Sequence, residues 1–145
     1  MVKKWTAIAN VKPGKKNARL YAELVEEEFY ELIDAWKDKE FEGIVDGAVD
    51  LLWVAEGLLM MLGVDVDKAK EAVAKSNFSK FTDNEAVAKG SVIGYNASGT
   101  PAYCDTVEHE GKTLYIVRRK SDNKILKPAT YEAPDWGFLI PPEWF

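Results

Sequence analysis

Apolar residues recur every three or four positions along the first half of the chain, which is the spacing of amphipathic helices. The pattern runs from Leu20 to Trp36 and from Ile44 to Leu62, and a shorter helix follows from about Asp67 to Phe81. Gly63 is placed to end the second helix, and Asp65 or Asp67 can cap the third through a side-chain oxygen. We therefore expect three helices before residue 82.

After residue 90 the pattern changes to short runs typical of strands. Residues 101–107 (PAYCDTV) and 113–120 (TLYIVRRK) are joined by EHEGK and followed by the turn SDNK, which predicts a small antiparallel hairpin. Residues 128–145 are rich in proline and aromatic residues, so we expect them to form an ordered arm that lies over another surface.

Length and charge then narrow the class of protein. A chain of 145 residues is long enough for a single domain, with a helical core at about 17–81 and the hairpin and arm at about 90–145. A net charge of −5 argues against nucleic acid as a partner. Cys104 is the single cysteine and cannot form an internal disulfide, and we identify no leader or membrane segment. We expect a cytoplasmic protein, in a bacterium or a phage-infected host, with a small-molecule partner and no membrane partner.

The stretch EEEFYEL, residues 26–32, places the acids of the first helix in two groups. On a wheel of about 100° per residue, the apolar side chains span an arc of about 220°. Glu28 and Glu31 fall inside this arc, Glu27 lies at its edge, and the other acids lie on the polar side. A single glutamate inside the apolar arc would fit a solvent-exposed edge of the core. Two unpaired carboxylates would each cost several kcal/mol if buried, so they require nearby cations.

The second helix adds carboxylates rather than cations. Asp46 and Asp50 are four residues apart on one face, in a helix that is apolar around almost its whole circumference. Oxygen-only ligands favour Mg²⁺ or Mn²⁺, and there is no Cys/His set for zinc. The lone His109 is interpreted as a surface residue in a turn.

The acidic motif also carries a resemblance. Residues 27–31 (EEFYE) match the EExxE signature of the all-α nucleoside triphosphate pyrophosphatases, the group that contains MazG, dimeric dUTPases and phosphoribosyl-ATP pyrophosphohydrolase. DGAVDLLWVAEG, KSNFSKF and RRKSDNKILKPATYEAPDW are similar, in this order, to segments of a phage and bacterial branch labelled phosphoribosyl-ATP pyrophosphohydrolase-like. The resemblance spans roughly residues 17–136. In one departure, the usual ExxD element would place glutamate at Gly47, whereas this chain has Asp46 and Asp50.

The resemblance implies a mainly α helical bundle, completed by oligomerisation, that cleaves a nucleotide between its α- and β-phosphates. Mg²⁺ or Mn²⁺ would be held by Glu27, Glu28, Glu31, Asp50 and Asp46. Glu27 or Glu28 would take a proton from the attacking water. The substrate would be a nucleoside triphosphate, with dGTP as a first guess. Phosphoribosyl-ATP is the alternative substrate, and a non-catalytic module that binds a nucleotide or a protein partner is the alternative class.

Candidate substrate-binding residues lie outside the acidic motif. Ser76, Asn77 and Lys80 offer hydroxyl, amide and ammonium groups, although an ordinary helix end would have the same composition. Lys127 is a candidate phosphate contact or a solvated charge, and Trp53 is either a base-stacking or a core residue.

The second helix also predicts self-association, because one helical hairpin covers only part of its apolar circumference. In a single chain we expect the following side chains to be exposed: Leu52, Trp53, Leu59, Met60 and Met61. Their burial favours a homodimer or homotetramer, with the arm from Pro128 onward packed across the bundle.

Overall fold

The computed structural model describes residues 1–145, which form two compact units. Unit 1 contains Met1–Ala69 and Gly137–Phe145, and unit 2 contains Lys70–Trp136. The elements are α1 (Val2–Ile8), α2 (Lys15–Asp38), α3 (Phe41–Met61), α4 (Val66–Phe78), β1 (Phe81–Thr82), α5 (Glu85–Ala97), β2 (Ala102–His109) and β3 (Lys112–Arg119). The fold is therefore mainly α with a small antiparallel sheet, as predicted.

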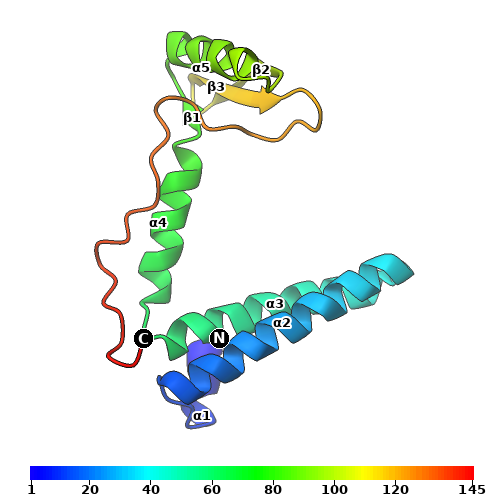
Figure 1. The fold of residues 1–145 in the computed structure, drawn as a ribbon, viewed down its shortest axis with the longest axis vertical. Coiled ribbons are helices and arrows are strands. Elements are labelled where there is room, and N and C mark those ends of the chain that lie inside the picture. Colours follow the sequence, from blue (N-terminus) through cyan, green and yellow to red (C-terminus); the bar gives the residue numbers. More distant parts are fainter. The chain divides into compact units, whose positions relative to one another are not determined.

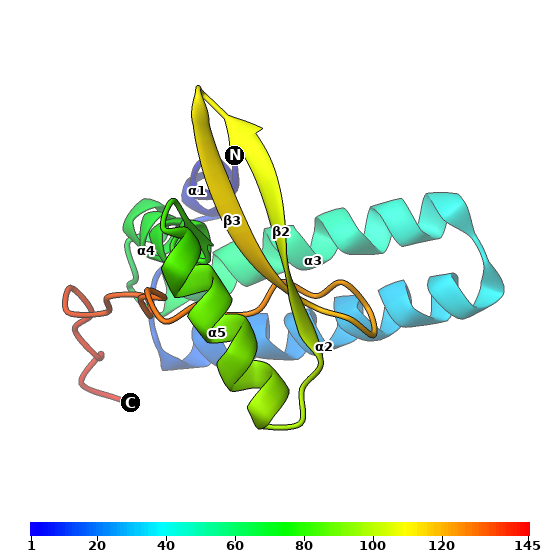
Figure 2. The ribbon, with the colours of Figure 1, turned by 90° about the horizontal axis from the view of Figure 1, so that it is seen from above.

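Helices α2 and α3 form an antiparallel hairpin in unit 1 and lie side by side in both views (Figures 1 and 2). Both predicted helices are confirmed, and α2 is longer than predicted at both ends. Helix α2 ends at Asp38, and the capping residue Lys39 has a left-handed conformation with φ of 59° and donates its N–H to carbonyls of the last turn. A lysine rather than a glycine therefore marks this boundary.

Glycines on α3 bring the two helices close together. A Cβ added to Gly47 would lie 3.0 Å from the Leu32 Cα, and one added to Gly57 would lie 2.5 Å from Cδ1 of Tyr21 and nearer still to Cε1. Since real Cβ atoms do not approach other atoms so closely, only glycine fits at position 57 without movement of the ring. These contacts fix which residues of the two helices face each other.

The core of unit 1 lies at the end of the hairpin that carries the chain termini. Tyr21 and Met61 are buried there, and Trp144 from the end of the C-terminal arm packs against them. The prediction that Met61 is exposed in a single chain is wrong, since it is only 1% exposed. Trp53, Leu59 and Met60 are half-buried rather than exposed. The N-terminal segment and the arm cover this end of α3, which the helical pattern alone did not indicate.

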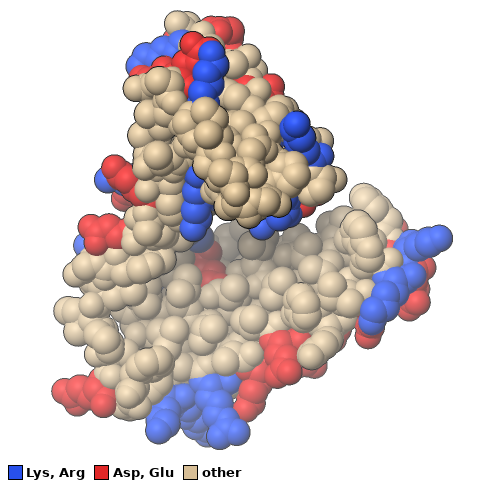
Figure 3. All heavy atoms as spheres, turned by 45° about the horizontal axis from the view of Figure 1, so that its top comes forward, with Lys and Arg blue, Asp and Glu red and all other residues tan.

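The other end of the hairpin keeps a large apolar surface. Exposed side chains recur along one face of α3, at Phe41 (76%), Val45, Val49 and Leu52 (72%). Figure 3 shows that the visible face of the hairpin is largely free of charged side chains. No single helix is long and apolar enough to cross a membrane, and only α3 and α4 counted together as a bent pair reach that length and composition.

The predicted end of α3 and start of α4 are confirmed. Gly63 has φ of +76°, and the N–H groups of Gly63 and Val64 donate to Met60 and Leu59 in the pattern of a Schellman motif. Asp65 Oδ1 then accepts the N–H of Lys68 at 3.2 Å. Helix α4 ends at Phe78, three residues before its predicted end.

Unit 2 contains the predicted hairpin and two elements that were not predicted. β2 and β3 pair antiparallel over their whole length, and β1 adds a third strand with Phe81 opposite Ile116. Helix α5, capped by the Asn84 side chain, packs on the sheet through Ala88, which contacts Val117. Since α5 contains two glycines and buries only a small side chain fully, its sequence shows no strong apolar stripe.

Candidate acidic site on the helical hairpin

The α2–α3 hairpin places two carboxylates, one from each helix, at the same level along the hairpin, where Glu28 is half-buried and Asp50 is exposed. Gly47 lies against Leu32, and Gly57 lies against Tyr21. Because the helices are antiparallel, Asp50, one turn after Gly47, is level with the turn of α2 that precedes Leu32. Glu28 lies in that turn and is half-buried. The predicted partners from the two acidic motifs therefore face each other across the hairpin.

These carboxylates influence one another electrostatically. Partial burial raises the pKa of Glu28 above its ordinary value, and the charges of Glu31, Asp50, Glu27 and Asp46 raise it further, in that order. The other four predicted metal ligands thus lie within electrostatic reach of Glu28.

No basic side chain of the chain neutralises this group. The ion pairs on α2 join Arg19 to Glu23 and Lys37 to Asp34, on the polar side of the helix. Between Glu23 and Glu56 the basic residues are Lys37 and Lys39 alone. Twelve acids occupy the same stretch: Glu23, Glu26, Glu27, Glu28, Glu31, Asp34, Asp38, Glu40, Glu42, Asp46, Asp50 and Glu56. The site therefore has the charge and the oxygen-only donors that suit a hard divalent cation.

The carboxylates do not converge into a closed coordination shell. No three Asp, Glu, His or Cys side chains lie close enough together to hold a metal ion. Glu31 and Asp46 instead line an open cavity of about 330 Å³ near the end of the hairpin, together with Asp34, Asp38 and Glu40. The donor chemistry fits a divalent cation, while the ligand assignment remains a prediction.

The structure explains why glutamate is absent at the usual ExxD position. Gly47 is buried, and a Cβ there would lie 3.0 to 3.2 Å from backbone and side-chain atoms of Leu32. A glutamate at this position would push the two helices apart. Asp46 is one residue earlier, at the exposed edge of the contact, where a carboxylate fits without this clash.

The raised pKa of Glu28 predicts how the free energy of unfolding changes with pH. A carboxyl whose pKa is higher in the folded state than in the unfolded state destabilises the fold when it is ionised. Without metal, Glu28→Gln should therefore be more stable than the wild type at pH 7. The advantage should decrease as the pH falls and disappear below the ordinary pKa of 4.5, where Glu28 is protonated in both states.

Urea unfolding at a series of pH values measures this difference. Glu26→Gln, on the polar face of the same helix, is the matched control and should show no comparable gain. A Glu28→Gln variant that is less stable than the wild type at pH 7 would contradict the proposed repulsion.

The predicted substrate-binding residues are divided between the units. Trp53 is in unit 1, is half-buried and packs against the core cluster. Ser76, Asn77, Lys80 and Lys127 are all in unit 2.

Tyr131 contacts Ser76 and Lys127, two residues of this second group. Ser76 Oγ donates to the Tyr131 phenol oxygen at 3.1 Å, and the Lys127 ammonium lies 4.3 Å from the centre of the Tyr131 ring. Tyr131 was not among the site residues predicted from the sequence. Only its position, four residues after Lys127 in KPATYEA, could have indicated a role beside that lysine.

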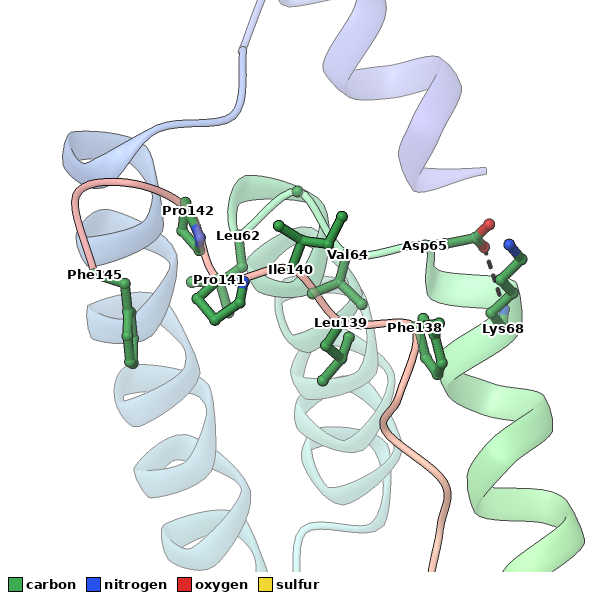
Figure 4. A pocket seen from close by; sticks show the side chains of 11 residues that line it. Leu62, Val64, Asp65, Lys68, Phe138, Leu139, Ile140, Pro141, Pro142 and Phe145 are labelled. Carbon is green, nitrogen blue, oxygen red and sulfur yellow. Dashed lines mark hydrogen bonds between the residues drawn. The ribbon is translucent and has the colours of Figure 1, made fainter.

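The C-terminal arm forms a cavity of about 280 Å³ in unit 1 (Figure 4). Residues 138–142 and Phe145 line one side, and the turn between α3 and α4 lines the other. The hydrogen-bonded pair of Asp65 and Lys68 lies at one end, and the remaining walls are mainly apolar. None of the predicted site residues lines this cavity.

Comparison with known proteins agrees with the acidic motif. Residues 8–77 match the family model for phosphoribosyl-ATP pyrophosphohydrolase. The chain is also similar to "Uncharacterized protein L479" of Acanthamoeba polyphaga mimivirus, with 30% identity over 76 residues that cover 51% of this chain and 30% of that protein. This chain thus spans less than a third of its viral relative. No solved structure matches it.

The matched residues include the whole α2–α3 hairpin and all five acids of the candidate site, whereas Lys80, Lys127 and Tyr131 lie beyond them. The resemblance predicted from the sequence is therefore confirmed for the region that carries the acidic motifs. Residues 8–77, just under half of the chain, are similar to the phosphoribosyl-ATP pyrophosphohydrolase family, which belongs to the MazG-like all-α NTP pyrophosphatase superfamily.

Proposed function

We propose that this protein is a Mg²⁺- or Mn²⁺-dependent pyrophosphohydrolase that converts a nucleoside triphosphate to the monophosphate and pyrophosphate. The family match supports a pyrophosphohydrolase activity in general. The observation that carries the specific proposal is the pair of facing carboxylates, Glu28 and Asp50, with three further acids around them and no basic partner.

Each acid has a proposed role. The metal ligands would be Glu27, Glu28, Glu31, Asp50 and Asp46. When bound, a divalent cation supplies positive charge that offsets the charge of the triphosphate and of the departing pyrophosphate. Glu27 or Glu28 would accept the proton of the attacking water.

The nucleotide is proposed to be a purine deoxynucleotide, with dGTP as the first to be tested. The candidate contacts in unit 2 are Ser76, Asn77, Lys80 and Lys127, and Trp53 on α3 is a separate candidate within unit 1. Hydroxyl, amide and ammonium groups suit the sugar, base and phosphates of such a ligand.

Two alternatives are favoured by specific observations. Phosphoribosyl-ATP is favoured by the description of the matching family. A non-catalytic nucleotide-binding module is favoured by Gly47 at the usual glutamate position and by the absence of three converging ligands. Incubation with each common dNTP and NTP and with phosphoribosyl-ATP, in Mg²⁺ or Mn²⁺, distinguishes the proposed function from the two alternatives. Turnover of phosphoribosyl-ATP alone would favour the first alternative, and binding without turnover of any compound would favour the second.

We further propose that the protein is a homodimer or homotetramer. The exposed stripe of Phe41, Val45, Val49 and Leu52 runs along the same helix as Asp46 and Asp50. Burial of each large apolar side chain stabilises an interface by roughly 1.5 to 3 kcal/mol. A second copy packed on this stripe would therefore also shield the acidic site from water.

Leu52→Glu should reduce the assembly to single chains and abolish activity with it, because an unpaired carboxylate would be buried in the interface. Light scattering after size exclusion measures the mass. Ile93→Glu is the control, since Ile93 is a similarly exposed side chain (69%) on α5, outside the stripe. A wild-type protein with the mass of one chain at micromolar concentration and normal activity would contradict the proposal.

A further inference from the structure

The tail segment Lys127–Glu132 is fixed against the end of α4 within unit 2. Ser76, which is only 4% exposed, donates its hydroxyl hydrogen to the phenol oxygen of Tyr131 at 3.1 Å. The Glu132 N–H donates to Ser79 Oγ at 2.9 Å. These bonds hold the Tyr131 ring at the surface in a defined position.

Helix α5 fixes the other end of the same segment. The Tyr95 hydroxyl donates to the Lys127 carbonyl at 3.0 Å, and the Ala129 N–H donates to Ser91 Oγ at 2.9 Å. Pro128, between them, is buried. Lys127 and Tyr131 therefore project from an anchored backbone, and a ligand that contacts both would not have to order this segment.

Hydrogen-bond donors surround the Tyr131 phenol. The phenol oxygen accepts from Ser76, whereas its own O–H has no acceptor within the chain. The Lys80 ammonium donates to Asn77 Oδ1 at 2.7 Å and keeps two further hydrogens for other acceptors. Lys80 follows Ser76 by four residues, just after the end of α4, and the Lys127 ammonium lies 4.3 Å from the centre of the Tyr131 ring. The hydrogen bond from Ser76 and, after it, the charges of Lys127 and Lys80 lower the pKa of Tyr131.

No carboxylate balances these two lysines. The nearest acidic residue in the tail, Glu132, has its carboxylate 3.9 Å from the Lys75 ammonium. Neither Lys80 nor Lys127 forms an ion pair. Two positive charges and a free hydroxyl donor therefore suit a doubly charged oxyanion with several acceptor oxygens, such as a phosphate group.

We propose that Lys80, Lys127 and Tyr131 bind a phosphate group, supplied either by inorganic pyrophosphate or by a nucleotide. Ser76 is a positioning residue that orients the phenol. The inference deepens the proposed function, in which Lys80 and Lys127 are already candidate nucleotide contacts, and it rests on that function for the choice of ligand. All three residues lie outside the family match, and the binding requires no divalent metal. It can therefore be tested separately from catalysis.

The test is calorimetric titration of the full chain in EDTA, with inorganic pyrophosphate in one series and dGTP in the other. Loss of a charged donor should weaken binding roughly tenfold in Lys127→Gln, and loss of the hydroxyl should weaken it a few-fold in Tyr131→Phe, which keeps the ring under Lys127. Lys124→Gln removes an exposed lysine of the same tail and should bind like the wild type. Asp50→Asn should also bind like the wild type, which separates this site from the acidic hairpin.

The two series identify the source of the phosphate. Similar affinities for pyrophosphate and dGTP would support a site for the phosphate group alone, and binding of dGTP only would support a site for nucleotide phosphates. The proposal is overturned if the wild type binds neither ligand saturably, or if Lys124→Gln weakens binding as much as Lys127→Gln does.

Discussion

Glu31→Gln is expected to abolish nucleotide turnover, with a loss of at least roughly 100-fold, while the protein remains folded. Glu31 is exposed, so the amide can replace the carboxylate without a change in packing. The negative charge of Glu31 nevertheless raises the pKa of Glu28, which belongs to the acidic site. Removal of one anionic ligand should therefore weaken Mg²⁺ binding, which calorimetry measures beside the steady-state rate.

Glu26→Gln is the control for this substitution. Glu26 is five residues earlier on α2, is also exposed, and lies on the polar side of the helix away from Asp50. Turnover and Mg²⁺ affinity should match the wild type in this variant. Wild-type turnover in Glu31→Gln would remove this residue from the catalytic site.

Gly57→Ala is expected to destabilise unit 1 by about 3 kcal/mol, although alanine ordinarily stabilises a helix relative to glycine. The new methyl group would overlap the ring of Tyr21, which is itself buried in the core of the hairpin. Relief of the overlap requires the helices to separate or the ring to leave its position, and either change would also disturb the register that brings Glu28 opposite Asp50.

Gly94→Ala makes the same chemical change where there is free space. No atom lies within 4 Å of a Cβ added to Gly94 in α5, so helix propensity alone should stabilise unit 2 by roughly 0.5 to 1 kcal/mol. Thermal unfolding followed by circular dichroism compares the two variants. Equal melting temperatures for Gly57→Ala and the wild type would show that the close contact at Tyr21 is absent in solution.

The helices that bury continuous apolar faces could be predicted from sequence, whereas elements stabilised mainly by their surroundings could not. Helices α2 and α3 have long stretches of apolar residues at helical spacing, and the β2–β3 hairpin is marked by its turn. Helix α5 buries only Ala88 fully, and β1 has two residues, so neither leaves a periodic signal. Trp144, which is distant in sequence, packs against the core cluster that contains Met61.

The same distinction applies to the candidate sites. The two acidic motifs could be identified from their spacing. The helical wheel placed both Glu28 and Glu31 on the apolar face, whereas in the structure Glu28 is half-buried and Glu31 is exposed. That Glu28 and Asp50 face each other follows from the contacts of Gly47 and Gly57, which the sequence does not display. Tyr131 joins Ser76 through the folding of the tail onto α4, so no local pattern could connect these two residues.

The central claim is that the acidic hairpin directs cleavage between the α- and β-phosphates. The most direct measurement is ³¹P NMR of the products formed from dGTP and Mg²⁺ by the wild type, with Asp50→Asn as the inactive reference. The account predicts dGMP and pyrophosphate in equal amounts, formed by the wild type only. Formation of dGDP and inorganic phosphate, or equal rates in Asp50→Asn, would contradict it.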